Sequence, residues 1–231
     1  MQRQWQMSES FAVGGLLAFV GGYLDAYTYI CRGQVFCNAQ TGNIVLLGIH
    51  LANGNLEAML YYLLPMLAFV AGIFTVLLLR NKMQFSRGLH WRQLIVCIEI
   101  LLLFIICFIP SGDLNLLVDI LISFVCAMQV QAFRKLHGHV FATTMCTGNL
   151  RSATEMLFMF LKTRDHTLLK HGMKYYAIIG IFILGAAAGS FITTLIREIA
   201  VSICCGILAV VFIMMFIQER GQKNLKQQNP L

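Results

Sequence analysis

The chain has 231 residues, of which 58% are hydrophobic and only 12% are charged, and its mean hydropathy is +0.75. A soluble domain carries roughly 25% charged residues, so the composition predicts an all-α integral membrane protein without a separate soluble domain. The formal net charge of +7 does not indicate a nucleic-acid partner. Basic residues in membrane proteins mark cytoplasmic loops, and no basic–aromatic binding module occurs.

Six stretches approach the ~20 apolar residues that cross the hydrocarbon core of a bilayer. In chain order they are Phe11–Cys31, Leu60–Leu79, Leu94–Ile109, Leu114–Phe133, Tyr175–Ile196 and Ile199–Ile217. Short tails at 1–10 and 218–231 flank them, and we expect both to be cytoplasmic. Two further segments, Val35–Ala52 and Val140–Leu161, are ambiguous because a polar Thr-Gly-Asn interrupts each.

The two halves of the chain repeat each other. Thr41-Gly42-Asn43 recurs as Thr147-Gly148-Asn149, 106 residues later, and Ala71–Arg80 recurs as Ala188–Arg197 with five of ten positions identical. The second offset is 117 residues, so we place an 11-residue insertion in Lys162–Lys174, which we expect to be a polar loop. The repeat predicts one membrane unit over 11–110 and a second over 114–217.

The distribution of lysine and arginine discriminates among topologies. If both ambiguous segments cross the membrane, giving eight spans, the basic residues other than Arg151 divide 8 against 8. If neither crosses, 15 of 17 lie on one side and only Arg32 and Arg197 lie on the other, as the positive-inside rule favours. A seven-span version scores equally well, but it treats two homologous segments differently. We therefore expect six transmembrane helices plus two re-entrant half-helices, in an inverted 3+3 repeat.

The Thr-Gly-Asn segments predict the starts of the half-helices. We expect Thr41 and Thr147 to be N-caps, with glycine permitting a sharp reversal. Asn43–Ala52 would then form a helix of ~15 Å, about half the hydrocarbon thickness. Two helix N-termini meeting near the midplane suit an anion or a small polar solute, and broken helices at matching places indicate a transport site. The alternative is a packed helix break that binds nothing.

The proposed solute site includes both Thr-Gly-Asn segments and the polar residues around them. Its predicted members are Asp25, Gln40, Thr41, Gly42, Asn43, Gln129, Gln131, Thr147, Gly148, Asn149 and Arg151. Asp25 is the best candidate among the intramembrane carboxylates because it belongs to the repeated unit, opposite Gln131, whereas Glu99 and Asp119 are as readily interfacial. For Arg151, a local ion pair with Glu155 is favoured over contact with a solute.

No pattern predicts a metal, a cofactor or an enzymatic reaction. The eight cysteines form no Cys-x-x-Cys pair, and the histidines lack metal-ligand spacing. Neither His-Glu-x-x-His nor Gly-x-Ser-x-Gly is present. The small residues of 185–189 are expected to let helices approach within the chain, with a homo-oligomer as the alternative.

Two blocks of residues resemble the YoaK family. The first comprises Gly22-Tyr23-Leu24-Asp25-Ala26, Val35-Phe36, Gln40-Thr41-Gly42-Asn43 and Leu47-Gly48, and the second comprises Gln129-Val130-Gln131-Ala132 with Ala142-Thr143-Thr144 and Thr147-Gly148-Asn149-Leu150. The resemblance implies a multi-pass bacterial inner-membrane protein. It supplies no substrate or reaction, because the family's function is unknown.

From the residues themselves we expect a small-solute transporter or channel in contact with the lipid bilayer. A structural or regulatory membrane protein is the alternative, and an intramembrane enzyme is a weaker one.

Overall fold

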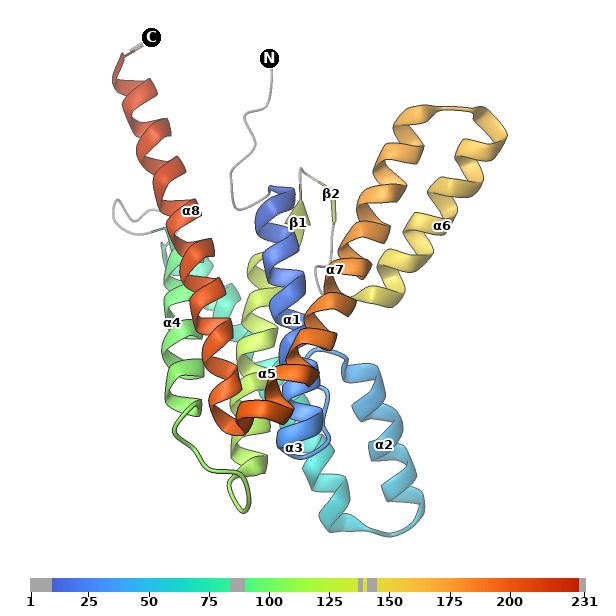
Figure 1. The fold of residues 1–231 in the computed structure, drawn as a ribbon, viewed down its shortest axis with the longest axis vertical. Coiled ribbons are helices and arrows are strands. Elements are labelled where there is room, and N and C mark those ends of the chain that lie inside the picture. Colours follow the sequence, from blue (N-terminus) through green and yellow to red (C-terminus); the bar gives the residue numbers. More distant parts are fainter. Residues whose placement is uncertain (1–9, 84–89, 137–138, 141–144, 229–231) are drawn as a thin grey trace.

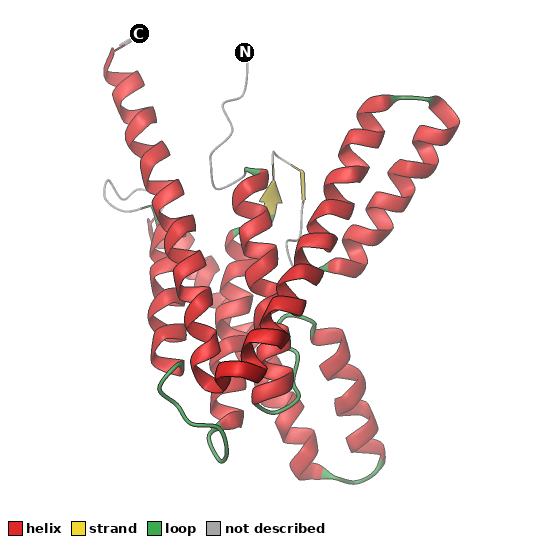
Figure 2. Ribbon diagram, viewed as in Figure 1, coloured by secondary structure: helices red, strands yellow, loops and turns green. Residues whose placement is uncertain are grey.

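The computed structural model describes residues 10–83, 90–136, 139–140 and 145–228. Helices dominate this part of the chain, as Figure 2 shows. Their bounds are α1 Phe11–Cys31, α2 Gln40–Ala52, α3 Leu56–Met83, α4 Trp91–Ile106, α5 Asn115–Ala132, α6 Cys146–Thr163, α7 His166–Ile196, the 3-10 helix η2 Arg197–Val201 and α8 Ser202–Gln228. Strands β1 Lys135–Leu136 and β2 His139–Val140 form a two-residue antiparallel pairing.

Most of the helices run up and down the molecule, whereas two of them, α2 and α6, begin near its middle (Figure 1). From a start near mid-height, α2 runs to the end that we call the lower face, which is formed by residues 32–34, 53–55, 107–114 and 197–201. α6 also starts near mid-height but runs to the opposite end, where it joins α7 beyond the start of α1 (Figure 1). The chain therefore contains two helical hairpins, α2–α3 and α6–α7, that point in opposite directions.

Glycines bring the long helices into close contact at two crossings. On the α1–α7 crossing, a Cβ built on Gly185 would lie 2.1 Å from the carbonyl oxygen of Phe19, and one on Gly189 would lie 2.7 Å from that of Tyr23. On the α3–α5 crossing, a Cβ on Gly72 would lie 2.5 Å from the carbonyl oxygen of Phe124. Gly72 and Gly189 occupy matching positions of the repeat, so the two crossings use the same small residue for close approach.

The described helices make the chain an all-α membrane protein. Four helical stretches are long and apolar enough to cross a bilayer: α1, α3, α5 and the 52-residue stretch His166–Ile217, which contains α7 and most of α8. At ~1.5 Å per residue, 52 residues would extend ~78 Å, more than twice the ~30 Å hydrocarbon core. The chain instead turns back at η2, so α7 and α8 lie antiparallel (Figure 1). α4 has 16 residues and is shorter than a typical span.

The predicted N-caps are wrong. α2 begins at Gln40 with Ala39 as its N-cap, and α6 begins at Cys146 with Met145 as its N-cap. Thr41 and Thr147 are therefore the second residues of their helices. The glycines that follow have no positive φ, because the chain reverses before the helix starts rather than at Thr-Gly-Asn. At 13 residues, α2 is about 20 Å long, more than the ~15 Å predicted.

The polar segment Lys162–Lys174 is not the predicted loop. α6 continues to Thr163 and α7 begins at His166, so only Arg164 and Asp165 join them. Arg164 adopts a left-handed conformation with φ 58°, and the Asp165 side chain accepts a hydrogen bond from the Thr167 backbone N–H at 2.8 Å. This C-cap and N-cap geometry lets two helices meet at a two-residue turn. The predicted tail 218–231 likewise continues α8 as far as Gln228.

Candidate functional site

The two Thr-Gly-Asn segments occupy the same helical positions. Each forms the second to fourth residues of its helix, after N-caps with nearly equal dihedral angles: φ −83°, ψ 64° at Ala39 and φ −90°, ψ 73° at Met145. Neither N-cap side chain makes a capping hydrogen bond. The first backbone N–H groups of a helix have no partner inside the helix, so they must be satisfied from elsewhere.

Asn43 ties the start of α2 to the loop that precedes it. Its Oδ1 accepts the Phe36 backbone N–H at 3.1 Å, and its Nδ2 donates to the Phe36 carbonyl at 2.6 Å and to Gln40 Oε1 at 3.0 Å. Gln40 in turn donates to the Cys37 carbonyl at 2.9 Å. Asn43 is fully buried, and its counterpart Asn149 is 3% exposed. The asparagine of the first repeat therefore holds the helix break in shape.

Asp25 lies near the starts of both α2 and α6. From α1, its carboxylate accepts the Asn38 backbone N–H at 2.7 Å, just before α2 begins. The same carboxyl interacts electrostatically with the thiol of Cys146, the first residue of α6. A carboxylate at a helix N-terminus complements the positive end of the helix dipole. Asp25 therefore supplies a hydrogen-bond acceptor at the start of α2, where the sequence predicted Thr41 as the N-cap.

The remaining Thr-Gly-Asn residues differ in exposure. The Thr41 and Thr147 side chains are exposed. A Cβ on Gly42 would touch the Phe36 ring at 3.1 Å, whereas one on Gly148 would meet nothing within 4 Å. The two segments thus leave hydroxyl groups accessible while burying the asparagines.

The two glutamines of α5 have different surroundings. Gln129 is 1% exposed, and its Nε2 donates to the Leu17 carbonyl of α1 at 2.9 Å. This hydrogen bond connects the first and fifth helices across the core. Gln131 is half-buried, two residues further along the same helix.

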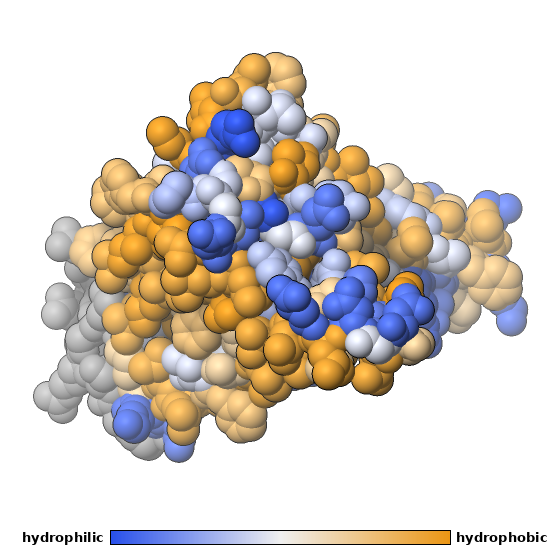
Figure 3. Space-filling view, turned by 90° about the horizontal axis from the view of Figure 1, so that it is seen from below, coloured by the Kyte–Doolittle hydropathy of each residue, from blue (hydrophilic) through white to orange (hydrophobic). Residues whose placement is uncertain are grey.

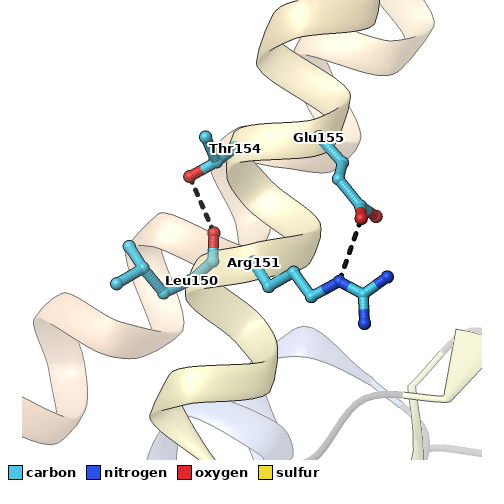
Figure 4. Close-up of polar contacts among 4 residues, drawn as sticks. All are labelled: Leu150, Arg151, Thr154 and Glu155. Atoms are coloured by element: carbon cyan, nitrogen blue, oxygen red, sulfur yellow. Dashed lines mark hydrogen bonds and ion pairs between the residues drawn. The ribbon is translucent and has the colours of Figure 1, made fainter.

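Arg151 lies on the outside of α6. Its Nε is 2.9 Å from Glu155 Oε1, and the two side chains are 80% and 60% exposed. Figure 4 shows this pair on the opposite side of the helix from Thr154, whose hydroxyl donates to the Leu150 carbonyl at 2.8 Å. The predicted ion pair is confirmed, and an exposed pair of this kind contributes at most about 0.5 kcal/mol.

Three buried polar groups were not assigned to the candidate site from the sequence. Asn38 donates to the Gly21 carbonyl at 3.1 Å, while its Oδ1 is buried without a partner. Glu99 and Asp119 are both fully buried inside the protein. Asn38 follows a cysteine in an apolar loop, and only its position in the repeated block could have drawn attention to it. Among the described residues, no group of three or more His, Cys, Asp or Glu side chains is placed to hold a metal ion.

A polar break in two opposed helical hairpins, enclosed by apolar helices, defines a multi-pass helical membrane protein. The family model described as "Protein of unknown function (DUF1275)" matches residues 13–214, and the chain belongs to this family. It is 27% identical over 180 residues to the UPF0700 transmembrane protein YoaK of Bacillus subtilis (strain 168), covering 74% of this chain and 78% of that protein. These matches confirm the YoaK-family resemblance. No solved structure matches the chain.

Proposed function

We propose that the chain is a small-solute transporter or channel and that its site lies between the starts of α2 and α6. One observation carries the proposal: α2 and α6 start inside the molecule at matching Thr-Gly-Asn segments, with the Asp25 carboxyl near both starts. This carboxyl accepts the Asn38 backbone N–H just before α2 and interacts electrostatically with Cys146, the first residue of α6. Irregular backbone and charge at membrane depth are costly unless they line a polar path. Broken helices in two halves are typical of transport sites.

The groups at the site favour a small neutral polar solute over a bare anion. Helix N-termini offer N–H donors, and the exposed hydroxyls of Thr41 and Thr147 donate or accept. The nearby Asp25 carboxylate and the unpartnered Oδ1 of Asn38 accept hydrogen bonds. A solute with both donors and acceptors satisfies this set, whereas an anion would face the Asp25 charge. The proposed activity is movement of such a solute and involves no chemical reaction.

We further propose six spans in an inverted 3+3 repeat, with units over 11–110 and 114–217 and with α2 and α6 re-entrant. The packing supports this arrangement because exchanging the units converts the α1–α7 contact into the α5–α3 contact, and α2–α3 into α6–α7. The charges support an orientation with both termini in the bacterial cytoplasm. Arg32 and Arg197 lie at the lower face, while Arg80, Arg134 and the α6–α7 turn lie toward the opposite end.

Cysteine labelling tests this topology. In a cysteine-depleted full-length chain, single cysteines at Asn53 and Arg164 report the two hairpin turns to an impermeant thiol reagent. We expect Asn53→Cys to react only from outside intact cells and Arg164→Cys only after the membrane is opened. Reaction of both from the same side would refute the opposed hairpins.

Flux into liposomes tests the function. We expect the reconstituted full-length protein to admit members of a panel of radiolabelled urea, small amides, polyols and neutral amino acids. Asp25→Asn should lower that flux at least 10-fold, since it keeps the size of the side chain but removes its charge. Asp113→Asn, at an exposed lower-face acid, is the matched control and should match the wild type.

Thr41→Ala and Thr147→Ala should also lower the flux, whereas Thr194→Ala, at an exposed threonine of α7, should not. Absence of flux for every member of the panel, or equal flux through Asp25→Asn and Asp113→Asn, would contradict the proposal.

A structural or regulatory role is the second candidate because of the α6–α7 hairpin. Its turn end stands apart from the other helices in Figure 1 and exposes Lys162, Arg164 and Lys170. Clustered basic residues at a membrane surface attract anionic lipid or an acidic partner. Replacing these three residues by glutamate should abolish binding to liposomes rich in phosphatidylserine or capture of a partner while leaving solute flux intact. Unchanged binding would refute this role.

A further inference from the structure

Arg32, directly after α1, is a buried cation with one free end. It is 7% exposed, and its Nε and Nη2 donate to the Tyr27 hydroxyl at 2.9 and 2.5 Å. Nη2 also donates to the Ile109 carbonyl at 3.0 Å. The Nη1 group is buried and has no hydrogen-bond partner. A guanidinium held on one side with its other donors unused is a fixed recognition group, because its planar fork cannot turn away.

Asp119 of α5 is a buried carboxylate that also has one atom without a partner, and its charge is opposite to that of Arg32. It is fully buried, and its Oδ2 accepts the Gly33 backbone N–H at 3.1 Å, while Oδ1 is buried without a partner. Asp119 interacts electrostatically with Arg32, yet the two side chains do not form an ion pair within 4.0 Å. A buried donor or acceptor left unsatisfied costs about 1–3 kcal/mol, and more when it is charged. Arg32 and Asp119 thus each keep one buried polar atom without a partner, and a third group that carries both charges would satisfy both atoms.

The neighbouring acid is already engaged. Glu198 of η2 accepts the Ser111 backbone N–H at 3.2 Å and the Ser111 hydroxyl. Its own carbonyl accepts the Tyr27 hydroxyl at 3.2 Å. These contacts fix Tyr27, which in turn fixes Arg32, so that of Glu198 and Asp119 it is Asp119 that keeps an oxygen without a partner. The lower face, seen directly in Figure 3, gathers polar residues at its centre within a rim of apolar ones, so a polar ligand could approach from that side.

We propose that Arg32 and Asp119 form a binding site for a small zwitterion, with its carboxylate on Arg32 Nη1 and its ammonium on Asp119 Oδ1. A monovalent anion would pair with Arg32 but meet the like charge of Asp119, and a monovalent cation would face the reverse conflict. A zwitterion such as a short amino acid satisfies both free atoms and leaves no net charge in the site. This site is separate from the Thr-Gly-Asn segments, and binding to it does not require transport.

Calorimetric titration of the detergent-solubilised full-length protein tests the proposal. The panel is glycine, β-alanine and taurine, with acetate and methylammonium as singly charged probes. We expect saturable binding of at least one zwitterion to the wild type and no binding of either singly charged probe. Arg32→Gln and Asp119→Asn should each weaken zwitterion binding at least 10-fold. Arg197→Gln and Asp113→Asn, exposed residues of the same charges at the same face, should leave it unchanged.

A change in which ligand the Asp119→Asn variant binds distinguishes loss of ligand recognition from misfolding of the protein. Asp119→Asn removes the charge that repels anions, so this variant should lose glycine and gain acetate. An unfolded protein would gain nothing. The proposal is overturned if no zwitterion binds the wild type, if the exposed-residue controls lose binding as the buried variants do, or if Asp119→Asn loses glycine without gaining acetate. Zwitterion binding without flux in liposomes would support this site while contradicting the transport proposal.

Discussion

Gly185→Ala tests whether the α1–α7 crossing depends on backbone-to-backbone approach. The new Cβ would lie 2.1 Å from the Phe19 carbonyl oxygen, 2.8 Å from its carbonyl carbon and 2.9 Å from its Cα. Ordinary van der Waals contact begins at about 3.4 Å, so α1 and α7 would have to separate by about 1 Å. The obstacle is backbone on a helix and cannot rotate aside as a side chain can. Close packing would then be lost along the whole crossing.

The magnitude follows from two opposing effects. Overpacking costs typically 1–3 kcal/mol, and a rigid backbone obstacle places the cost near 3 kcal/mol. Alanine gains about 1 kcal/mol over glycine in a helix interior. Gly185→Ala should therefore lower the free energy of unfolding by about 2 kcal/mol. Gly180→Ala, on the same helix with nothing within 4 Å of its Cβ, should raise it by up to about 1 kcal/mol.

Unfolding in mixed micelles with increasing SDS, followed by helical circular dichroism, measures both variants on one scale. The expected difference between them is about 3 kcal/mol, because the propensity gain cancels and the clash remains. If the two variants unfold within about 0.5 kcal/mol of each other, close approach at Gly185 does not stabilise the fold.

Two further predictions concern the helix ends. Asn43→Ala removes both hydrogen bonds to the Phe36 backbone and should cost about 2–3 kcal/mol in the same assay, whereas the exposed Asn53→Ala should stay within about 0.5 kcal/mol of wild type; equal effects would contradict the role given to Asn43. At the start of α7, the Thr167 hydroxyl and backbone N–H hold the pKa of the Asp165 carboxyl below its ordinary 3.8. A depressed pKa means that this cap stabilises the folded state above pH 3.8 and is lost as the pH falls through the lowered value. Thr167→Ala should raise the Asp165 pKa in an NMR titration of the carboxyl carbon, and an unchanged value would rule out the assigned cause.

Much of the candidate site could be predicted because its residues recur. The doubled Thr-Gly-Asn and the position of Asp25 within the repeated unit directed attention to the residues around the starts of α2 and α6. The prediction that Thr41 and Thr147 are the N-caps of these helices was wrong. A threonine before a helix resembles an N-cap in any sequence. Here, however, the backbone N–H just before α2, that of Asn38, donates to Asp25, which lies 13 positions earlier in the chain. Capping rules consider only neighbours along the chain, so they cannot predict a carboxylate that is contributed by another helix.

The segment Lys162–Lys174 shows a second limit. Its charges resembled a loop, yet two helices meet there through Arg164 and Asp165 alone. Helical hairpins that extend past the apolar region tolerate charged residues, because their polar faces meet water. Composition marks where the apolar region ends, and it does not mark where the helix ends.

Sequence by itself determined the membrane class and the repeat, because hydrophobicity and residue order are properties of the chain. Only the tertiary structure decided which polar residues meet. Arg32 and Asp119 lie 87 positions apart, and so do Ser111 and Glu198. Such contacts depend on how α1, α5 and η2 cross, and the crossings depend on glycines whose partners lie more than 50 residues away. Long-range packing therefore decides which polar residues can act together in each of the two proposed sites.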